Sequence, residues 1–510
     1  MSEIQQAPAA DGDVQPIENR GDNRSQRPRS DAFKAFITTG WGPHTDLPLA
    51  AGPAAPFSAG RRARISAQFP GERLVVPAGS YKVRSNDCDY PFRPHSAFAH
   101  LTGLGGEQEP DAVLVLHPVA DGTGDDGSRH RAVLYFRPLA GRETEEFYSD
   151  SRYGEFWVGA RPTLADIATL TGVATAHLDD LRDALGKDIG SGGVHLLVVP
   201  GVDDSVESVV EEIRAVEDAG ERDALFAEAL SELRLVKDAY EVDQMRLAVN
   251  ETIDGFAKIV RDLPIAIEQE RGERIIEGTF GAHARLRGNA VGYDTIAAAG
   301  EHATTLHWTQ NDGAVRPGEL VLVDAGLEVD SLYTADVTRT LPIDGTFTEV
   351  QRRIYTAVLD AADAAFAVAV PGARFRDVHS AAMEVIAARL GEWGLLPGTV
   401  EESLDPEGQF HRRWMVHGTS HHLGLDVHDC AQARASMYLD GILTPGMVFT
   451  IEPGLYFKSD DLTVPADYRG IGVRIEDDVL VTAEGNENLS AALPRRPEAV
   501  EAWMATLLTD

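Results

Sequence analysis

Two aspartates in a strand-like setting give this sequence its first sign of chemistry. Asp324 and Asp336 lie in VLVDAGLEVDSLYTADVTRTLP (321–342), which reads as two apolar strands joined by a turn. If the turn centres near Asp330, the two aspartates lie opposite each other in a hairpin, with Cβ atoms about 5 Å apart. An acidic pair in apolar surroundings is costly unless a cation compensates its charge. An exposed strand edge would be the simpler explanation for an isolated pair, so the interpretation depends on the rest of the chain.

A dense run of histidines follows downstream. The segment HGTSHHLGLDVHD (417–429) contains His417, His421, His422 and His428. Its glycines, and the lack of an HExxH motif in the sequence, argue against a helical zinc-protease site. Any metal role must therefore come from strand or loop geometry. For most of the four histidines, a hydrogen-bonded structural role is the simpler hypothesis.

Two more acids are embedded in apolar runs that resemble strands. Glu452 lies in VFTIEPGLY and Glu476 in YRGIGVRIEDDVLVT. An ion pair with Arg474 would explain Glu476 if it stood alone. Taken together, two Asp, two Glu and one His form an oxygen-rich donor set, which favours Mn²⁺, Mg²⁺ or related ions over a Cys/His zinc site. The four carboxylates would also balance the charge of two divalent cations.

The elements that must position these residues are mixed helices and strands. Apolar residues from Val242 to Val260 recur every three or four positions, which predicts an amphipathic helix. The predicted strands TIAAAG, LVLVDAG and ADVTRTL come next, followed by helices over about 349–370 and 378–393 and by strands to about 482. Hairpins dominate over a regular βαβ rhythm, so the pattern favours an α+β class with an antiparallel sheet.

The first half of the chain has a different pattern. Short apolar runs bounded by Gly, Pro and Asp predict strands, with helical segments between and after them. These runs lie at 112–118, 132–138, 155–159 and 194–201. This half reads as an α/β domain. The polar segment 120–131 predicts an exposed hairpin loop, and residues 1–30, which contain almost no aromatic side chain, predict a disordered tail.

The composition sets broad limits on function. A chain of 510 residues exceeds what one core usually supports, so two domains are expected. The sequence has neither a membrane-length apolar stretch nor an apolar signal core, which predicts a cytoplasmic protein. Its two cysteines, Cys88 and Cys430, are expected to be free. A net charge of -35 argues against binding to nucleic acid or to anionic membranes.

The motifs, taken in order, resemble a known family. DAG with DVTRT, HGTSHHLGLDVHD, TIEPGLY and GVRIED are similar to those of the pita-bread metallopeptidases, especially the Xaa-Pro aminopeptidase (aminopeptidase P) family, over roughly 240–500. RPHSAFAHLTGL (93–104) with AVLVLHP also resembles the creatinase-like N-terminal domain of that family. The resemblance implies an α+β protein with an N-terminal α/β creatinase-like domain at 31–238. A pita-bread catalytic domain with a curved antiparallel sheet would then cover 239–510.

The resemblance also implies roles for individual residues. It implies two divalent metal ions per subunit, with Mn²⁺ favoured, and the ligands are Asp324, Asp336, His421, Glu452 and Glu476. Asp336 and Glu476 would bridge the two ions. The implied catalytic or substrate-side residues are His307, His417, His428 and Glu452, and the supporting residues are Arg474 and Tyr456. Trp308 is expected to supply aromatic surface to the substrate pocket. Asp324 and Asp336 are twelve positions apart, where eleven is expected in the family, which predicts one extra residue in the turn. We expect His422 to line the pocket without binding metal.

The function that this resemblance implies is that of a metal-dependent aminopeptidase. It would release the N-terminal residue from peptides with proline in the second position, by attack of a metal-bridging hydroxide, and would act as a homodimer or homotetramer. A prolidase, which cleaves Xaa-Pro dipeptides with the same metal set, is the nearest alternative. A non-catalytic binding protein on the same fold, or creatinase-like chemistry, is disfavoured because all five ligands are present.

Overall fold

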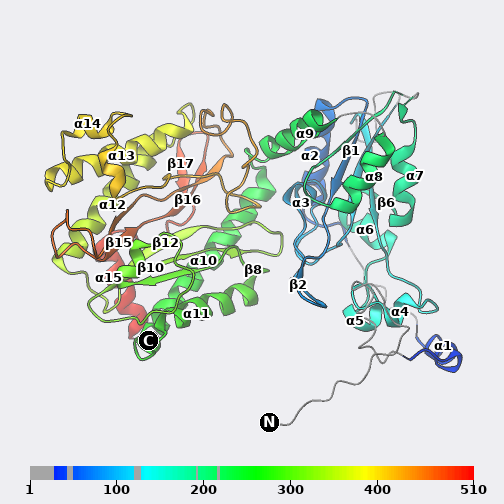
Figure 1. The fold of residues 1–510 in the computed structure, drawn as a ribbon, viewed down its shortest axis with the longest axis horizontal. Helices are drawn as coiled ribbons and strands as arrows, with labels where there is room; N and C mark the ends of the chain where they lie inside the picture. The colour runs from blue at the N-terminus through cyan, green and yellow to red at the C-terminus, as the bar shows by residue number, and fades with distance from the viewer. Residues whose placement is uncertain (1–27, 43–49, 120–127, 191–192, 215–218, 510) are drawn as a thin grey trace, which may run out of the picture.

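The computed structural model describes residues 28–42, 50–119, 128–190, 193–214 and 219–509. The predicted tail at 1–30 and the predicted loop at 120–131 lie mostly outside these residues. Figure 1 shows an N-terminal part and a C-terminal part side by side, each with its own sheets and helices. None of the described helices is both long enough and apolar enough to span a membrane. Cys88 and Cys430 are both free, as predicted.

The N-terminal part is built on a mixed five-stranded sheet in the order β6-β5-β4-β1-β7. The strands are β1 (Glu72–Pro77), β4 (Val113–Pro118), β5 (His130–Phe136), β6 (Ala174–His177) and β7 (His195–Val198), with a separate hairpin of β2 (Val83–Ser85) and β3 (Cys88–Asp89). Helices cover both faces, because alternate residues of the buried β1 enter two different cores: Leu74 and Val76 enter one, Val75 the other. The helices are α1 (Asp31–Ile37), α2 (Ala55–Gln68), α3 (Ser96–Thr102), α4 (Glu146–Ser149), α5 (Glu155–Val158), α6 (Leu164–Thr171), η2 (Leu178–Asp180), α7 (Leu181–Gly186), α8 (Asp204–Arg214) and α9 (Gly220–Leu233).

Three of the four strands predicted in this half are confirmed, and the fourth is wrong. The run at 155–159 forms the helical turn α5 instead of a strand. The Gly159 N–H donates to the Glu155 carbonyl, and Gly159 ends the turn with φ +83°, a conformation that glycine adopts readily. The apolar residues of the run remain exposed, so no sheet partner selects the extended form.

The C-terminal part begins with α10 (Ala239–Ile267), which confirms the predicted amphipathic helix. Asp238 and Glu241 form a reciprocal capping box at its start, and one face buries Met245, Val249 and Phe256 in the largest core. The other helices of this part are α11 (Gly272–Arg287), η4 (Gly300–Thr304), α12 (Glu349–Val368), α13 (Phe375–Glu392), α14 (Val400–Leu404), η5 (Phe410–Arg413) and α15 (Pro497–Leu508).

The strands of the C-terminal part pair antiparallel, which confirms the predicted α+β class. They form the sheets β12-β10-β9, β11-β8, β13-β16-β17 and β14-β15. Their bounds are β8 (Ala290–Val291), β9 (Ile296–Ala299), β10 (Leu320–Ala325), β11 (Leu327–Glu328), β12 (Val337–Pro342), β13 (Val448–Ile451), β14 (Gly454–Phe457), β15 (Ile471–Arg474), β16 (Asp477–Val481) and β17 (Asn486–Asn488).

The register of the aspartate hairpin differs from the prediction. Asp324 pairs with Thr338, not with Asp336, and the bridge between Glu328 and Thr334 keeps the same register, which centres the turn on Ser331. Asp336 is therefore a diagonal neighbour of Asp324. Because side chains alternate with a period of two, both carboxylates still lie on one face of the hairpin. The two carboxylates therefore share a face because of the strand period, although they are not direct cross-strand partners.

Gly326 allows the two arms of this hairpin to approach each other, which gives a first test. A Cβ at this position would lie 1.7 Å from the carbonyl oxygen of Ala335, a backbone atom that cannot move aside alone. We expect Gly326→Ala to lower the free energy of unfolding by about 2 kcal/mol or more, measured by urea denaturation of the metal-free chain. Gly281→Ala in α11, where a Cβ meets nothing within 4 Å, is the matched control and should be neutral or stabilising. Equal stability of the two variants would contradict this account.

Candidate active site

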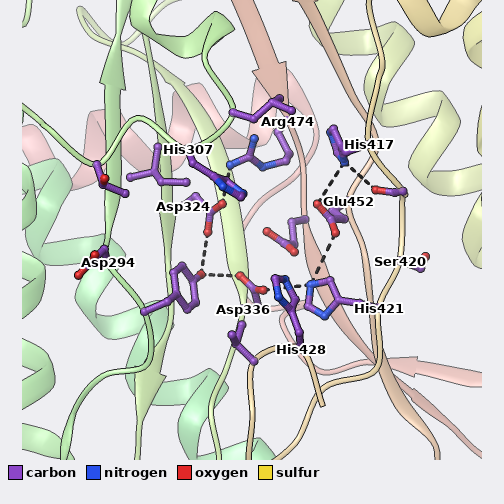
Figure 2. A pocket seen from close by; sticks show the side chains of 17 residues that line it. Asp294, His307, Asp324, Asp336, His417, Ser420, His421, His428, Glu452 and Arg474 are labelled. Atoms are coloured by element: carbon purple, nitrogen blue, oxygen red, sulfur yellow. Dashed lines mark hydrogen bonds and ion pairs between the residues drawn. The ribbon is translucent and has the colours of Figure 1, made fainter. Parts of the chain in front are cut away.

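A cavity of about 620 Å³ opens in the C-terminal part (Figure 2). Nine of the residues predicted to act in the site line it: His307, Asp324, Asp336, His417, His421, His428, Glu452, Arg474 and Glu476. They come from five separate segments of the chain. The acids lie in strands or directly beside them, and the histidines lie in loops.

The tightest group in the cavity consists of Asp336, His421 and Glu476. One donor atom from each of the three side chains lies within 4.8 Å of the others. Nε2 of His421 is 3.3 Å from Asp336 and 3.6 Å from Glu452. Asp324 joins the group through the hydroxyl of Tyr293, which lies 2.7 Å from Asp324 and 2.5 Å from Asp336. All five proposed metal ligands therefore converge on one small volume.

The hydrogen bonds of the backbone explain why these side chains converge. Asp336 immediately precedes β12, and its N–H donates to Asp478 on β16, 3.1 Å away. The N–H of Glu476 donates to the carbonyl of Thr338 on β12, and Glu452 follows β13 directly. The segment that carries His421 runs beside β13, where the backbone N–H of Thr450 donates to the His421 carbonyl. Neighbouring strands thus present their acids to the same side.

Arg474 fixes two of the acids from behind. Its guanidinium donates to Asp324 at 2.5 Å, to the Thr338 hydroxyl at 3.1 Å and to the Tyr456 hydroxyl at 3.1 Å. Thr338 in turn donates to Glu476 at 2.7 Å. Arg474 therefore pairs with Asp324, and not with Glu476 as the ion-pair alternative held. One buried arginine orients both carboxylates.

Tyr456 links Arg474 to a histidine of the cavity. Its hydroxyl lies 2.8 Å from Nε2 of His417, whose Nδ1 is 3.6 Å from Glu452. Tyr456 therefore supports the cavity from behind its wall. His428 lies on the opposite side, with its ring centroid 4.3 Å from that of His421.

The electrostatics of the cavity are those of crowded acids. Burial, together with the charges of neighbouring carboxylates, raises the pKa of Glu452 to about 7, and raises the pKa of Asp336 and of Glu476 as well. Burial opposes the charged form of His421, but its hydrogen bond to Asp336 and the charge of Glu452 raise the pKa of His421 to about 9. Protons therefore compensate part of the negative charge. Divalent cations would do so more completely, since metal binding displaces protons from its ligands.

The donor set fits such cations well. Four carboxylates and one imidazole form a hard, oxygen-rich site suited to Mn²⁺, Mg²⁺ or related ions, and no cysteine lines the cavity among the described residues. Thr338 and Tyr293 satisfy further lone pairs of the acids. Such supporting hydrogen bonds are typical of the residues around metal ligands.

Trp308 is the predicted site residue that the structure places elsewhere. Its indole N–H donates to Glu273, 2.9 Å away, and its ring stacks on His302 at 3.9 Å, so it does not line the cavity. Glu273 is fully buried and also accepts from the Gly313 N–H at 2.7 Å. These contacts fix the loop that carries His307. Trp308 therefore supports that loop and does not form a wall for substrate.

His422 also differs from the expectation that it lines the pocket. Its ring is buried, and it stacks on Phe375 with a centroid separation of 4.6 Å. Burial lowers the pKa of His422 to about 3. Tandem histidines on an extended segment point to opposite sides, so His421 faces the cavity while His422 enters the core.

The sequence reasoning missed three residues that shape the site. Thr338 lies two positions after Asp336, so the period of a strand could have placed both on one face. Tyr293 and Glu273 carry no comparable signal, because their partners are distant in the sequence. Only the folded chain brings them to the site.

Comparison with known proteins agrees with this geometry. Residues 243–483 match the model of metallopeptidase family M24, and residues 58–196 match the aminopeptidase P N-terminal domain. The chain is 50% identical to Xaa-Pro aminopeptidase 2 of Streptomyces coelicolor over 489 residues, which cover 96% of this chain and 99% of that relative. It is 34% identical to the Xaa-Pro aminopeptidase of Escherichia coli, over 88% of this chain and 97% of that relative.

Solved structures give the same result. Aminopeptidase PepP of Pseudomonas aeruginosa superposes with a TM-score of 0.77 at 30% identity, covering 91% of this chain and 100% of that one. Aminopeptidase P of E. coli with the inhibitor Pro-Leu superposes with a TM-score of 0.75 at 30% identity, covering 90% and 100%.

The tandem histidines give a sharp test of the site. His421→Ala should remove at least one divalent ion per chain, because it deletes the only imidazole in the tight donor group among the described residues. His422→Phe keeps the aromatic packing against Phe375 and should leave the metal content unchanged. Metal stoichiometry by mass spectrometry after Mn²⁺ loading and desalting distinguishes the two variants. The reverse pattern would show that His422 is the ligand.

Proposed function

Because this chain belongs to the Xaa-Pro aminopeptidases of metallopeptidase family M24, we propose that it removes the N-terminal residue from peptides whose second residue is proline. The observation that supports this function most is the convergence of Asp336, His421 and Glu476, whose donor atoms lie within 4.8 Å of one another. Asp324 and Glu452 extend this group into a five-residue set that can hold two ions.

We propose Mn²⁺ as the ion; Asp324, Asp336, His421, Glu452 and Glu476 would hold it. When bound, a pair of such ions supplies the Lewis acidity that activates a water molecule and polarises the scissile carbonyl. The chain itself keeps its acids oriented through Arg474 and Thr338. The ligands are thus held in place before substrate arrives, which lowers the cost of reorganisation.

Side chains around the donor group have substrate-side roles in this proposal. The Glu452 carboxylate lies between His417 and His421, a position from which it can carry a proton toward the leaving nitrogen. His428 can donate a hydrogen bond to the substrate carbonyl as negative charge develops on it. His417, whose Nδ1 lies 2.6 Å from the Gly418 carbonyl, lines the cavity where the substrate would lie. His307 reaches the cavity from the loop fixed by Glu273 and can contact the peptide.

The walls of the cavity suit a proline ring. Ile296, Leu306 and Val427 supply apolar surface beside His307 and Tyr293. Proline has no backbone N–H, so a subsite for proline needs apolar contact and no acceptor for that hydrogen. Leu306 and Val427 take the role that the sequence had assigned to Trp308.

Three further features belong to the same proposal. We propose that the creatinase-like domain covers 31–238 and the catalytic domain 239–510, since α10 begins at Ala239. We also propose that the enzyme is cytoplasmic and that it forms a homodimer or homotetramer, as the family resemblance implies. A prolidase remains the nearest alternative, and a binding protein without catalysis is disfavoured because the full donor set is present.

Metal removal is the most direct test of the mechanism. Chelation followed by dialysis should abolish peptide cleavage, because the crowded acids would then be compensated only by protons. Addition of Mn²⁺ or Co²⁺ should restore it. The measurement is the rate of Ala-Pro-Ala hydrolysis by metal-stripped and reloaded protein, with metal content determined in parallel. Full activity in verified metal-free protein would disprove the proposal.

Substrate choice tests the assignment within the family. Xaa-Pro-Yaa should be cleaved at least tenfold faster than Xaa-Ala-Yaa, because an unpaired N–H costs roughly 1 to 3 kcal/mol and the lost apolar contact adds to that cost. The kcat/KM for Xaa-Pro-Yaa should also exceed that for the dipeptide Xaa-Pro, because the terminal carboxylate of the dipeptide would enter a cavity lined by acids. The measurement is kcat/KM for Ala-Pro-Ala, Ala-Ala-Ala and Ala-Pro under equal Mn²⁺ loading. Fastest cleavage of Ala-Pro would identify a prolidase, and equal rates for the tripeptides would exclude proline specificity.

A further inference from the structure

Arg93, in the N-terminal part, contacts two segments that carry the proposed metal ligands. Its Nε–H donates to Glu328 at 2.7 Å, and another N–H donates to the carbonyl oxygen of Leu425. The same guanidinium lies 3.5 Å from Asp426. Glu328 belongs to the aspartate hairpin, and Leu425 and Asp426 lie in the histidine segment (417–429). The Arg93 side chain therefore connects the aspartate hairpin to the histidine segment.

We propose that Arg93 is a positioning residue: it fixes the aspartate hairpin relative to the histidine segment, and so sets the affinity of the site for divalent cations. The inference rests on the proposed function. The inference gives the N-terminal part a role in the metal site. None of the described residues before Tyr293 lines the cavity, so this role must act through contacts outside it. Figure 1 shows the N-terminal part facing the C-terminal part on the side of β8.

The contact with Glu328 is a buried one. Glu328 is 5% exposed, and its second carboxylate oxygen accepts from Asn289 at 2.7 Å. A buried carboxylate that loses its cationic partner is strongly destabilised, so the hairpin would shift to bring Glu328 to water. Because Glu328 is only a few residues from Asp324, such a shift would move the ligands on the hairpin.

The outer half of the hairpin is joined to its neighbours by single backbone hydrogen bonds: Ala335 and Val329 bond across the two arms, and Asn289 and Gly292 donate from the segment at β8. Beyond Ala325, β11 pairs only with the two-residue strand β8 within the described chain, apart from the bridge to Thr334. The Thr334 N–H donates to the Gly424 carbonyl, which is a direct bond between the hairpin and the histidine segment. Arg93 adds a second connection nearby.

The histidine segment is anchored by the same small region of the N-terminal part. Ser96, at the start of α3, donates to Asp426 at 2.5 Å and also lies 3.4 Å from the Arg93 guanidinium. Only a planar guanidinium can direct several N–H groups to separate acceptors in fixed directions, so lysine is not an equivalent replacement. The geometry therefore depends on arginine at this position.

The test is a Mn²⁺ titration of the metal-stripped full chain by calorimetry, for wild type, Arg93→Met and Arg93→Lys. We expect the Kd of Arg93→Met to rise about 10-fold, the lower end of the range for losing a group that hydrogen-bonds a metal ligand, because Arg93 acts through Glu328 and Leu425 and not on a ligand itself. Arg93→Lys should give a smaller rise, because an ammonium can still pair with Glu328 but cannot also reach Leu425. Activity of both variants should recover in excess Mn²⁺ with KM for the peptide unchanged. Because excess Mn²⁺ also stabilises the folded state by mass action, the comparison is made with variants that circular dichroism shows to be folded without metal.

Two further variants locate the effect. Glu328→Gln should raise the Kd as well, and its combination with Arg93→Met should be less than additive, because both substitutions break one contact. Arg434→Met is the matched control: Arg434 forms a paired ion bridge at 2.6 and 2.7 Å to Glu232 of α9, away from the hairpin. Its Mn²⁺ affinity should equal that of the wild type.

The outcomes separate the inference from the proposed function. Wild-type affinity in Arg93→Met, or in Arg93→Lys if the methionine variant does not fold, overturns the role of Arg93 while leaving the aminopeptidase proposal intact. An equal loss in Arg434→Met also overturns it, since that result would reflect general loosening between the two parts. A wild-type chain that binds no divalent cation overturns the proposed function itself.

Discussion

The crowding of negative charge in one buried cavity is the constraint on which this structure depends. Burial raises the pKa of Asp336, Glu452 and Glu476 above their ordinary values, and the charge of Asp336 raises the pKa of the other two further. Carboxylates do not remain together in such a place without compensation. Arg474, His421 and the hydroxyls of Tyr293 and Thr338 supply part of it, and divalent cations supply the rest in the proposed enzyme.

The antiparallel pairing around the cavity is the means by which the chain holds these acids together. Each acid lies on a short strand or beside one, and the strands are joined by hydrogen bonds that leave little freedom of register. A second layer of buried ion pairs lies behind them: Arg339, fully buried, donates to Asp477 at 2.7 Å next to Glu476. This rigid layer holds the acids at fixed, short distances from one another despite their electrostatic repulsion.

Much of the fold and of the site could be predicted from sequence, because the signals were local. The amphipathic period of α10 and the apolar runs around Asp324 and Glu476 record burial directly. The wrong predictions concern residues whose partners the local pattern does not show. The run at 155–159 formed a helical turn because no strand pairs with it, and Trp308 turned toward Glu273, a partner 35 residues away. His422 entered the core because its neighbour faces the cavity. Tyr293 could not be found, since nothing near it in the sequence marks its contact with two aspartates.

The spread of the site along the chain has a consequence for its synthesis. Arg93 leaves the ribosome long before Glu476, and at about 5 to 20 residues per second the interval is on the order of 20 to 80 s. Once Val198 has emerged, the N-terminal sheet has all its strands and can fold. The acceptors of the Arg93 guanidinium, Glu328 and Leu425, are synthesised only later. The acids of the site emerge one after another into water, where their mutual repulsion is weak. A nascent chain is therefore inactive until its last hairpins pair, and hydrolytic capacity begins only with the finished molecule.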